Sequence, residues 1–392
     1  MMLIPKLALR NLLGAGLRTW LNVFVLSLSF ITIIFLQGMY SGMLRQVEVA
    51  TVDAEFGGGQ YWQANFDPFD PLSLPDAHAE IPDSLQSLID QGKATPILVV
   101  QGTIYPDGRV MPVMLKGIDP NQSVLKFPAK SLAMENEDLP VLIGERMAES
   151  ANLSKGDTVT IQWRDTNGTF DARDAQIVDV MNTIVPSIDS GQLWIPLPKL
   201  QEMMLMEKEA TMVIVIEGLK VSDNVAGWSF KDIDFLLSDI KQVVKMRTIG
   251  SSFIYVFLLF LAMLAIFNTQ VLSIFRRRKE MGTLMALGVT RMQLIRLFTL
   301  EGALNGVMAA ILAAIYGIPL LVHVARNGIG MPADFTDQFG WALGSSLFPT
   351  YGAALILGTT FLVLIVTTVV SYLPTRKIAK LKPTDALKGK LS

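Results

Sequence analysis

The chain has 392 residues, of which 51% are hydrophobic and 17% charged, and its formal net charge is −2. The hydrophobic residues gather in a few long blocks, which favours a membrane protein with one soluble domain over an ordinary soluble protein. Cysteine is absent, which excludes disulfides, thiol catalysis and cysteine metal sites.

Four apolar stretches are each long enough for the roughly 20 residues that cross the hydrocarbon core as a helix. The first follows an amphipathic segment, 1–18, which we expect to be a cytoplasmic helix. No small-residue cleavage site follows this stretch, so we interpret it as a retained anchor rather than a signal peptide. The predicted transmembrane helices are 19–44, 248–275, 300–325 and 351–374.

The long connection 45–247 alternates short β-rich runs with turn signals, which predicts one α+β domain of about 200 residues. Pro106-Asp107-Gly108 joins two of the runs and predicts a hairpin. The fold class is therefore membrane α-helical, with four transmembrane helices and one large α+β extracytoplasmic domain between the first and second. The predicted strands are 94–105, 109–117, 158–163, 175–181, 193–196 and 211–217, and the predicted helices are 82–91, 144–151 and 197–206.

The distribution of charge predicts the orientation in the membrane. Segments 1–18, 276–296 and 376–392 together carry fifteen Lys and Arg and two acids, whereas 45–247 carries seventeen Lys and Arg and thirty acids. Because Lys and Arg in short flanking loops set orientation, we expect both termini inside, including a basic tail 375–392, and the large domain outside. A short outer loop, 326–349, joins the last two spans. The acidic outer face argues against a nucleic-acid partner.

The segment 276–296 between the second and third spans is the most informative part of the chain. Four cations, Arg276 to Lys279, follow the span directly and are expected to hold its end in the cytosol. Met281, Leu284, Met285 and Leu287 then recur at helical spacing, which suits a short helix lying across a partner's groove. Gly288 is expected to end this helix. From the residues alone, a simple basic membrane-anchoring loop is an equally good interpretation.

Residues 278–288 read RKEMGTLMALG and resemble the "RRREIGxLRALG" coupling segment of FtsX-like permeases. This family includes MacB-type exporters and the lipoprotein-releasing Lol permeases. Residues 7–19 resemble the family's amphipathic N-terminal helix, and residues 374–387 its usual basic closure. Within 45–247, residues 141–148, 155–161, 177–180 and 194–197 are similar to its extracytoplasmic domain. The run GGGQYWQ at 57–63 is most similar to the Lol branch.

The resemblance implies a non-catalytic permease subunit of an ATP-binding-cassette (ABC) transporter in the bacterial inner membrane. It would pair with a second permease copy or a paralogue, and ATP and Mg would be bound by a separate ATPase subunit. ATP-driven closure of the ATPase would move the outer domain by mechanotransmission. The residues predicted to couple to the ATPase are Arg278, Lys279, Glu280, Met281, Gly282, Leu284, Ala286, Leu287 and Gly288.

For the cargo, the Lol resemblance implies extraction of lipoproteins from the inner membrane and handover to a periplasmic carrier. Two alternatives stay open. One is MacB-type export of peptides or small amphiphiles through a periplasmic adaptor, and the other is FtsX-like regulation of an envelope hydrolase without transport.

The sequence offers no convergent catalytic or metal-binding set. Gly389-Lys390 is followed by Leu391, so it is not a phosphate-binding loop, and a nucleotide site is expected on another chain. The acids of the proline-rich stretch 67–76 match no calcium loop, so a solvated turn is favoured. His78 and His323 lack a ligand pattern. We therefore expect no catalytic residue, metal or cofactor in this chain.

Three residue patterns concern the spans themselves. Small residues recur every four positions in the third span and predict close helix packing; they are Gly302, Gly306, Ala310 and Ala314. Aromatic residues in the first two spans could line an acyl-chain site, as the Lol resemblance implies, although ordinary lipid-facing or buried aromatics are the favoured alternative; they are Phe24, Phe30, Phe35, Phe253, Phe257 and Phe260. Polar residues in or beside the spans predict interhelical hydrogen bonds or a polar seam; they are Asn22, Asn268, Gln270, Glu301 and Asn305.

Overall fold

The structure is a computed structural model that describes residues 16–133, 139–183, 185–219, 224–330 and 346–376. The chain divides into two compact units. The helical unit contains 1–44, 244–329 and 347–392, and the sheet unit contains 45–243 and 330–346. Most of the predicted N-terminal helix 1–18, of the tail 375–392 and of the loop 326–349 lies outside the described residues.

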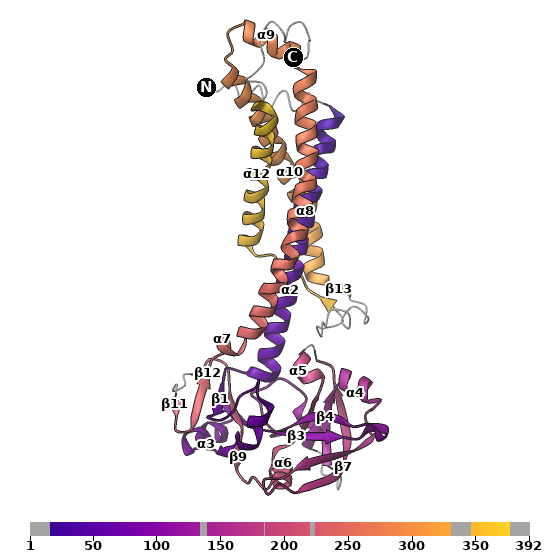
Figure 1. Ribbon diagram of the computed structural model, residues 1–392, viewed down its shortest axis with the longest axis vertical. Helices are drawn as coiled ribbons and strands as arrows, with labels where there is room; N and C mark the ends of the chain where they lie inside the picture. The colour runs from indigo at the N-terminus through magenta and orange to yellow at the C-terminus, as the bar shows by residue number, and fades with distance from the viewer. Residues whose placement is uncertain (1–15, 134–138, 184, 220–223, 331–345, 377–392) are drawn as a thin grey trace. The chain divides into compact units, whose positions relative to one another are not determined.

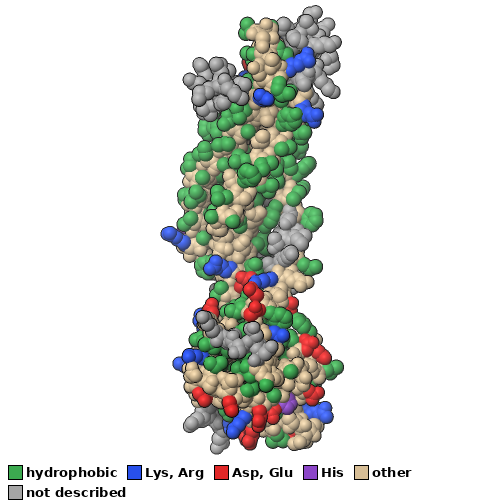
Figure 2. Space-filling view, turned by 90° about the vertical axis from the view of Figure 1, so that its left-hand side faces the viewer, with side chains coloured by type: hydrophobic (Ala, Val, Ile, Leu, Met, Phe, Trp, Pro, Cys, Tyr) green, Lys and Arg blue, Asp and Glu red, His purple; other side chains and the backbone are tan. Residues whose placement is uncertain are grey.

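Four helices of the described chain are long and apolar enough to cross a membrane (Figure 1). They are α2 (Leu17–Thr51), α8 (Ser238–Arg276), α10 (Arg291–Asn327) and α12 (Ala353–Thr375). On the face that Figure 2 shows, the side chains of the helical unit are mostly hydrophobic. This is the surface expected of a unit that contacts lipid.

The helices are longer than the apolar stretches that predicted them. α2 continues to Thr51 rather than ending at 44, and α8 begins at Ser238 rather than at 248. Hydropathy marks only the part of a helix that fits the hydrocarbon core, whereas polar residues such as Gln46 and Lys241 can continue a helix beyond it. The predicted limits therefore describe the apolar part of each helix and not its ends.

Inside the helical unit, α2, α10 and α12 share one buried cluster, which includes Phe30, Ile31, Ala309, Ala313 and Val363. Residues of α8 pack against its edge. The small side chains of α10 let the neighbouring helices approach closely.

The sheet unit is built on a ten-stranded mixed sheet in the order β11-β12-β1-β10-β3-β4-β8-β5-β7-β6. An additional antiparallel pairing of β3 with β6 closes the six strands β3, β4, β8, β5, β7 and β6 into a ring. The pairings β4–β8 and β5–β7 are parallel. The strands are β1 (Gln60–Gln63), β3 (Ala94–Ile104), β4 (Met111–Ile118), β5 (Leu139–Gly144), β6 (Thr158–Arg164), β7 (Phe170–Met181), β8 (Gln192–Pro196), β10 (Met212–Val215), β11 (Asn224–Val225) and β12 (Trp228–Lys231).

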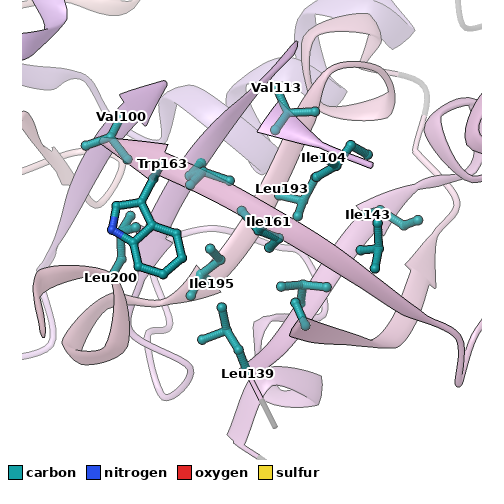
Figure 3. Close-up of a cluster of buried hydrophobic side chains, with 14 of the residues drawn as sticks. Val100, Ile104, Val113, Leu139, Ile143, Ile161, Trp163, Leu193, Ile195 and Leu200 are labelled. Atoms are coloured by element: carbon teal, nitrogen blue, oxygen red, sulfur yellow. The ribbon is translucent and has the colours of Figure 1, made fainter. Parts of the chain in front are cut away.

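Side chains of the ring strands converge on a buried apolar core (Figure 3). Because successive residues of a strand face opposite sides, Leu193 and Ile195 of β8 point into this core, while Trp194 belongs to a second cluster on the other face. The two faces of β8 therefore contact two different apolar clusters.

Short helices and strands complete the structure. The helices are η1 (Val52–Phe56), η2 (Pro71–Asp76), α3 (Asp83–Asp90), η3 (Pro106–Gly108), η4 (Ala129–Ala133), α4 (Glu145–Ala151), α5 (Pro186–Asp189), α6 (Leu197–Met204), α7 (Ile233–Leu236) and α9 (Arg278–Ala286). The strands outside the large sheet are β2 (Ala79–Glu80), β9 (Glu209–Ala210), β13 (Ile329–Gly330) and β14 (Ser346–Leu347), each of two residues.

All six predicted strands and all three predicted helices of the domain are present, with shifted ends. The hairpin turn is also confirmed, because η3 joins the antiparallel strands β3 and β4. β7 begins at Phe170 rather than at 175, since its exposed first half has no apolar signal. The strands β1, β5 and β12 were not predicted.

Candidate functional site

The segment between α8 and α10 folds as a short helix with a defined turn at each end. Arg277 leaves the helical conformation after α8, and α9 then runs from Arg278 to Ala286. Gly288 has φ +95°, a conformation that favours glycine, so the predicted end of the helix falls where the backbone requires it. Thr290 starts α10 in a capping box with Gln293.

Arg277 ties the junction of α8 and α9 to α10. Its Nη1 lies 3.1 Å from both carboxylate oxygens of Glu301, and its Nε donates to Glu280 at 2.9 Å. The guanidinium carbon also lies 5.2 Å from the centre of the Phe298 ring. The Arg277 side chain is 26% exposed and that of Glu301 is 9% exposed, so the pair is shielded from water. Sequence analysis treated these two residues separately and missed the pair.

The apolar side of α9 packs against the helical unit itself. Met281 is completely buried in a cluster with Ile274, Leu294, Ile295 and Phe298. Leu284 and Met285 pack partly buried against this cluster. The stripe interpreted as partner-facing is therefore covered largely by α8 and α10.

This packing divides the predicted coupling residues into two groups. Met281 and Gly282 are buried in this chain, so their predicted contact with the ATPase stays a prediction that would require α9 to move. Leu284 is half-buried, and the same holds for its predicted contact. The exposed members are Lys279, Glu280, Ala286, Leu287 and Gly288, and Leu287 is 78% exposed. The side chain of Arg278 is not among the described side chains, so its predicted contact stays a prediction.

The small residues of α10 form a buried stripe that differs from the predicted one. A Cβ at Gly302 would lie 2.1 Å from Ser371 Oγ, and one at Gly306 would lie 3.2 Å from Leu364 and Thr367 side-chain atoms, so both glycines permit close approach to α12. Ala310 is half-buried, but Ala314 is exposed, and Ala313 and Gly317 are buried instead. A step of four residues rotates about 40° beyond a full helical turn, so a four-residue repeat drifts off one face.

The aromatic residues proposed for an acyl-chain site do not form one group. Phe30 is 1% exposed and Phe35 packs against the same core, so Phe30 is not accessible to a ligand. Phe24 stacks on Tyr316 with ring centres 6.3 Å apart. The three of α8, Phe253, Phe257 and Phe260, are more than half exposed. A binding role for the exposed ones stays a prediction.

Among the described residues, no group of three or more His, Asp or Glu is placed to hold a metal ion. Asp67 accepts a hydrogen bond from the backbone N–H of Phe69, and Asp70 from that of Leu72, as the turn interpretation of this stretch requires. His78 bonds to Glu209 and to the carbonyl of Pro75.

Comparison with known proteins assigns part of the chain to a family. Residues 252–383, which contain α9 and α10, match the model described as FtsX-like permease C-terminal. An uncharacterized ABC transporter permease of Methanocaldococcus jannaschii is 27% identical over 168 residues, which cover 41% of this chain and 39% of the relative. The macrolide export ATP-binding/permease protein MacB of Wolinella succinogenes is 23% identical over 164 residues, 42% of this chain and 23% of the relative. The matches thus span well under half of either relative.

Two solved structures resemble the chain weakly. The extracellular domain of the noncanonic ABC-type transporter YknZ from Gram-positive bacteria gives a TM-score of 0.26 at 14% identity, covering 41% of this chain and 83% of that one. The periplasmic region of MacB from Actinobacillus actinomycetemcomitans gives 0.32 at 15% identity, covering 47% and 94%. At these scores the likeness adds nothing to the fold described above.

The family resemblance inferred from residues 278–288 is therefore confirmed by an independent match over a longer stretch, while closeness to the Lol branch stays a prediction. The chain contains an FtsX-like permease domain and is homologous to MacB and to other ABC transporter permeases.

Proposed function

We propose that this chain is the permease subunit of an ABC transporter that works by mechanotransmission in the bacterial inner membrane. A separate ATPase docks on the exposed side of α9, and closure of the ATPase pair displaces α9 together with the ends of α8 and α10. The chain itself carries no catalytic role, and ATP and Mg belong to the ATPase. A second permease copy or a paralogue completes the dimer.

The observation that carries this proposal is the way α9 is held. α9 has nine residues, which is too short for a stable isolated helix in water, so its stability comes from tertiary contacts. The contact of Arg277 Nη1 with both carboxylate oxygens of Glu301 and the burial of Met281 supply those contacts. A segment fixed in this way moves with α10 instead of pivoting alone, as force transmission requires.

The exposed side of α9 has the composition of a small docking surface. Leu287 is a large apolar side chain that is 78% exposed and directly follows α9, whose first turn carries the exposed charged residues Lys279 and Glu280. An apolar anchor surrounded by polar residues is a common arrangement at the energetic centre of a protein interface. We therefore assign the main contact to Leu287, with Lys279 and Glu280 at its rim.

For the cargo, we propose lipoprotein extraction from the inner membrane with release to a periplasmic carrier. This proposal is supported by the Lol-like run at 57–63. The macrolide export named for one relative supports MacB-type export as the second candidate. Mass spectrometry of material that co-purifies from native membranes separates them, because extraction predicts acylated proteins and export predicts a periplasmic adaptor.

The docking proposal is tested by the substitution Leu287→Glu. We expect the amount of co-purifying ATPase to fall at least about tenfold, because a buried apolar anchor becomes a buried unpaired charge. Val110→Glu is the matched control: Val110 is 67% exposed and lies in the sheet unit, so the same change there is expected to leave ATPase recovery unchanged. Equal recovery with Leu287→Glu, at equal membrane insertion, would overturn the assignment.

A further inference from the structure

A cavity of about 280 Å³ lies in the sheet unit, bounded by strands of the sheet and by the segment 64–76. Exposed Asp67, Pro68 and Pro71 stand at its edge, and the carbonyl of Pro71 accepts a hydrogen bond from Gln101 on β3. Its volume lies just below the roughly 300–1,000 Å³ of most small-molecule sites, so an occupant must be small. Most of its lining is apolar or aromatic, namely Phe56, Trp62, Phe66, Leu74, Ile97, Val99, Met114, Met212 and Ile214.

The two charged side chains of the cavity wall, Lys116 and Glu55, neutralise each other, while Asp67 lies at the exposed edge. Lys116 is 8% exposed, and its Nζ lies 3.0 Å from Glu55 Oε1 and 5.1 Å from the centre of the Trp194 ring. Gln60 donates to the backbone carbonyl of Glu55 and accepts from Trp62 Nε1. An ionic ligand would have to break the Lys116–Glu55 pair, so the cavity favours a neutral one.

Two residues of the lining each have a buried polar side-chain atom that lacks a hydrogen-bond partner among the described residues. The two groups are the Nε1–H of Trp194, which is a donor, and the Oε1 of Gln192, which is an acceptor. Trp194 is 1% exposed and Gln192 is 9% exposed. Both lie on β8 two residues apart, on the strand face opposite Leu193, which points into the ring core. Buried polar groups without partners destabilise a fold, so their retention points to a partner supplied from outside the chain.

We propose that this cavity binds a neutral amide group attached to a small apolar body. Both polar atoms, Trp194 Nε1 and Gln192 Oε1, are closed to solvent in this structure, so the cavity wall opens there as the ligand enters. The amide carbonyl then accepts the hydrogen bond from Trp194 Nε1–H, and the amide N–H donates to Gln192 Oε1. The apolar body contacts the aromatic rings of Trp62 and Phe66, which lie 5.1 Å apart between centres. An amide fits because it offers one acceptor and one donor without a net charge.

Amides of this kind occur in peptides and in N-acylated amphiphiles, and the chemistry at Trp194 and Gln192 is the same for both. The cavity lies entirely within the sheet unit and its test involves no ATPase. Failure of this inference therefore leaves the docking proposal intact, and the reverse also holds.

The test uses the full chain in nanodiscs with 5-fluorotryptophan at its six tryptophans, observed by ¹⁹F NMR. Trp194→Phe and Trp62→Phe assign the two cavity signals. Trp163, whose Nε1–H donates to the carbonyl of Met203 in the ring core, is the reference that should not move. Trp20, which is 47% exposed on α2, reports any partition of a probe into lipid.

The probes are N-isopentylacetamide and isopentyl acetate, which share the apolar body and the carbonyl but differ in the N–H. We expect saturable shifts at Trp194 and Trp62, with the amide binding at least about fivefold more tightly than the ester because only the amide satisfies Gln192. In Gln192→Leu this preference should disappear, while the spectrum without probe keeps the reference signal of Trp163.

Absence of a saturable shift at Trp194 in the wild-type chain, or equal binding of amide and ester there, would overturn the proposal without reliance on any variant. A preference for the amide that persists in Gln192→Leu would also overturn it. When the amide is preferred, comparison of N-acetyl-L-leucinamide with N-octylacetamide identifies the source: tighter binding of the first indicates a peptide, and of the second an acylated amphiphile.

Discussion

The α9 junction and the cavity of the sheet unit both contain a cation, a carboxylate and an aromatic ring in close contact, but the two groups of residues have different roles. At the junction, Arg277 lies beside Glu301 and 5.2 Å from the Phe298 ring. In the cavity, Lys116 lies beside Glu55 and 5.1 Å from the Trp194 ring. In each arrangement a cation lies beside a carboxylate and near an aromatic ring.

The difference lies in what surrounds each pair. Arg277 uses both its Nε and its Nη1 on carboxylates of its own chain, so these two nitrogens join α8, α9 and α10. Beside Lys116, the Trp194 Nε1–H and the Gln192 Oε1 have no partner among the described residues. A buried ion pair thus locks helices together at one place and neutralises a cavity wall at the other, which leaves the adjacent polar groups to select a ligand.

The largest effect is expected for Glu301→Ala. This change leaves the half-buried Arg277 guanidinium without its less exposed carboxylate partner and should lower the free energy of unfolding by about 1.5–3 kcal/mol. The measurement is SDS titration of the protein in mixed micelles. Glu280→Ala removes the more exposed partner of the same arginine and should cost clearly less. Equal losses for the two variants would contradict the structural role of Glu301.

A smaller effect on the same region is expected for Thr290→Ala. Thr290 Oγ1 accepts from the backbone N–H of Gln293, and Gln293 Oε1 accepts from that of Thr290. Loss of this capping box should cost about 1 kcal/mol, measured by the same titration. Thr290→Ser keeps the hydroxyl and serves as the control; a loss equal to that of Thr290→Ala would show that the cap does not stabilise the start of α10.

In the cavity, unlike at the α9 junction, removal of a buried polar group is expected not to lower the free energy of unfolding. Gln192→Leu removes a buried acceptor that has no partner, so the free energy of unfolding of the sheet unit should stay unchanged or rise by up to about 1 kcal/mol. Urea titration followed by tryptophan fluorescence measures it. A loss of more than about 1 kcal/mol would mean that Gln192 is a structural residue and would remove the contrast between the two regions.

Patterns of neighbouring residues predicted the helices and strands whose formation depends on hydropathy and turn residues. Apolar length predicted the four helices, and alternation with turn residues predicted β3, β4 and β8 and the turn at Asp107. The family resemblance likewise located α9. The exact ends were missed where polar residues continue a helix, as at Gln46, because hydropathy says nothing about them.

The contacts that define the two regions depend on tertiary structure and were not predicted. Met281 has the spacing of a partner-facing residue, and only the return of α10 shows that Leu294 and Phe298 cover it. Trp194 lies in the predicted strand 193–196, to which no site role was assigned, and Gln192 directly precedes that strand. The only sequence signal was that Gln192 lies two positions before Trp194, so both side chains share one face of the strand. This signal points to a site only once the cavity is known.

The most direct test of the central claim is site-specific photocrosslinking in native membranes. A photoreactive benzoylphenylalanine replaces Leu287, and the matched control carries it at Val110. The account predicts that irradiation joins position 287, but not position 110, to a protein with a phosphate-binding loop, identified by mass spectrometry. Crosslinks at 287 to lipid or to envelope proteins alone, with no ATP-binding protein, would contradict the assignment of α9 as the ATPase-docking segment.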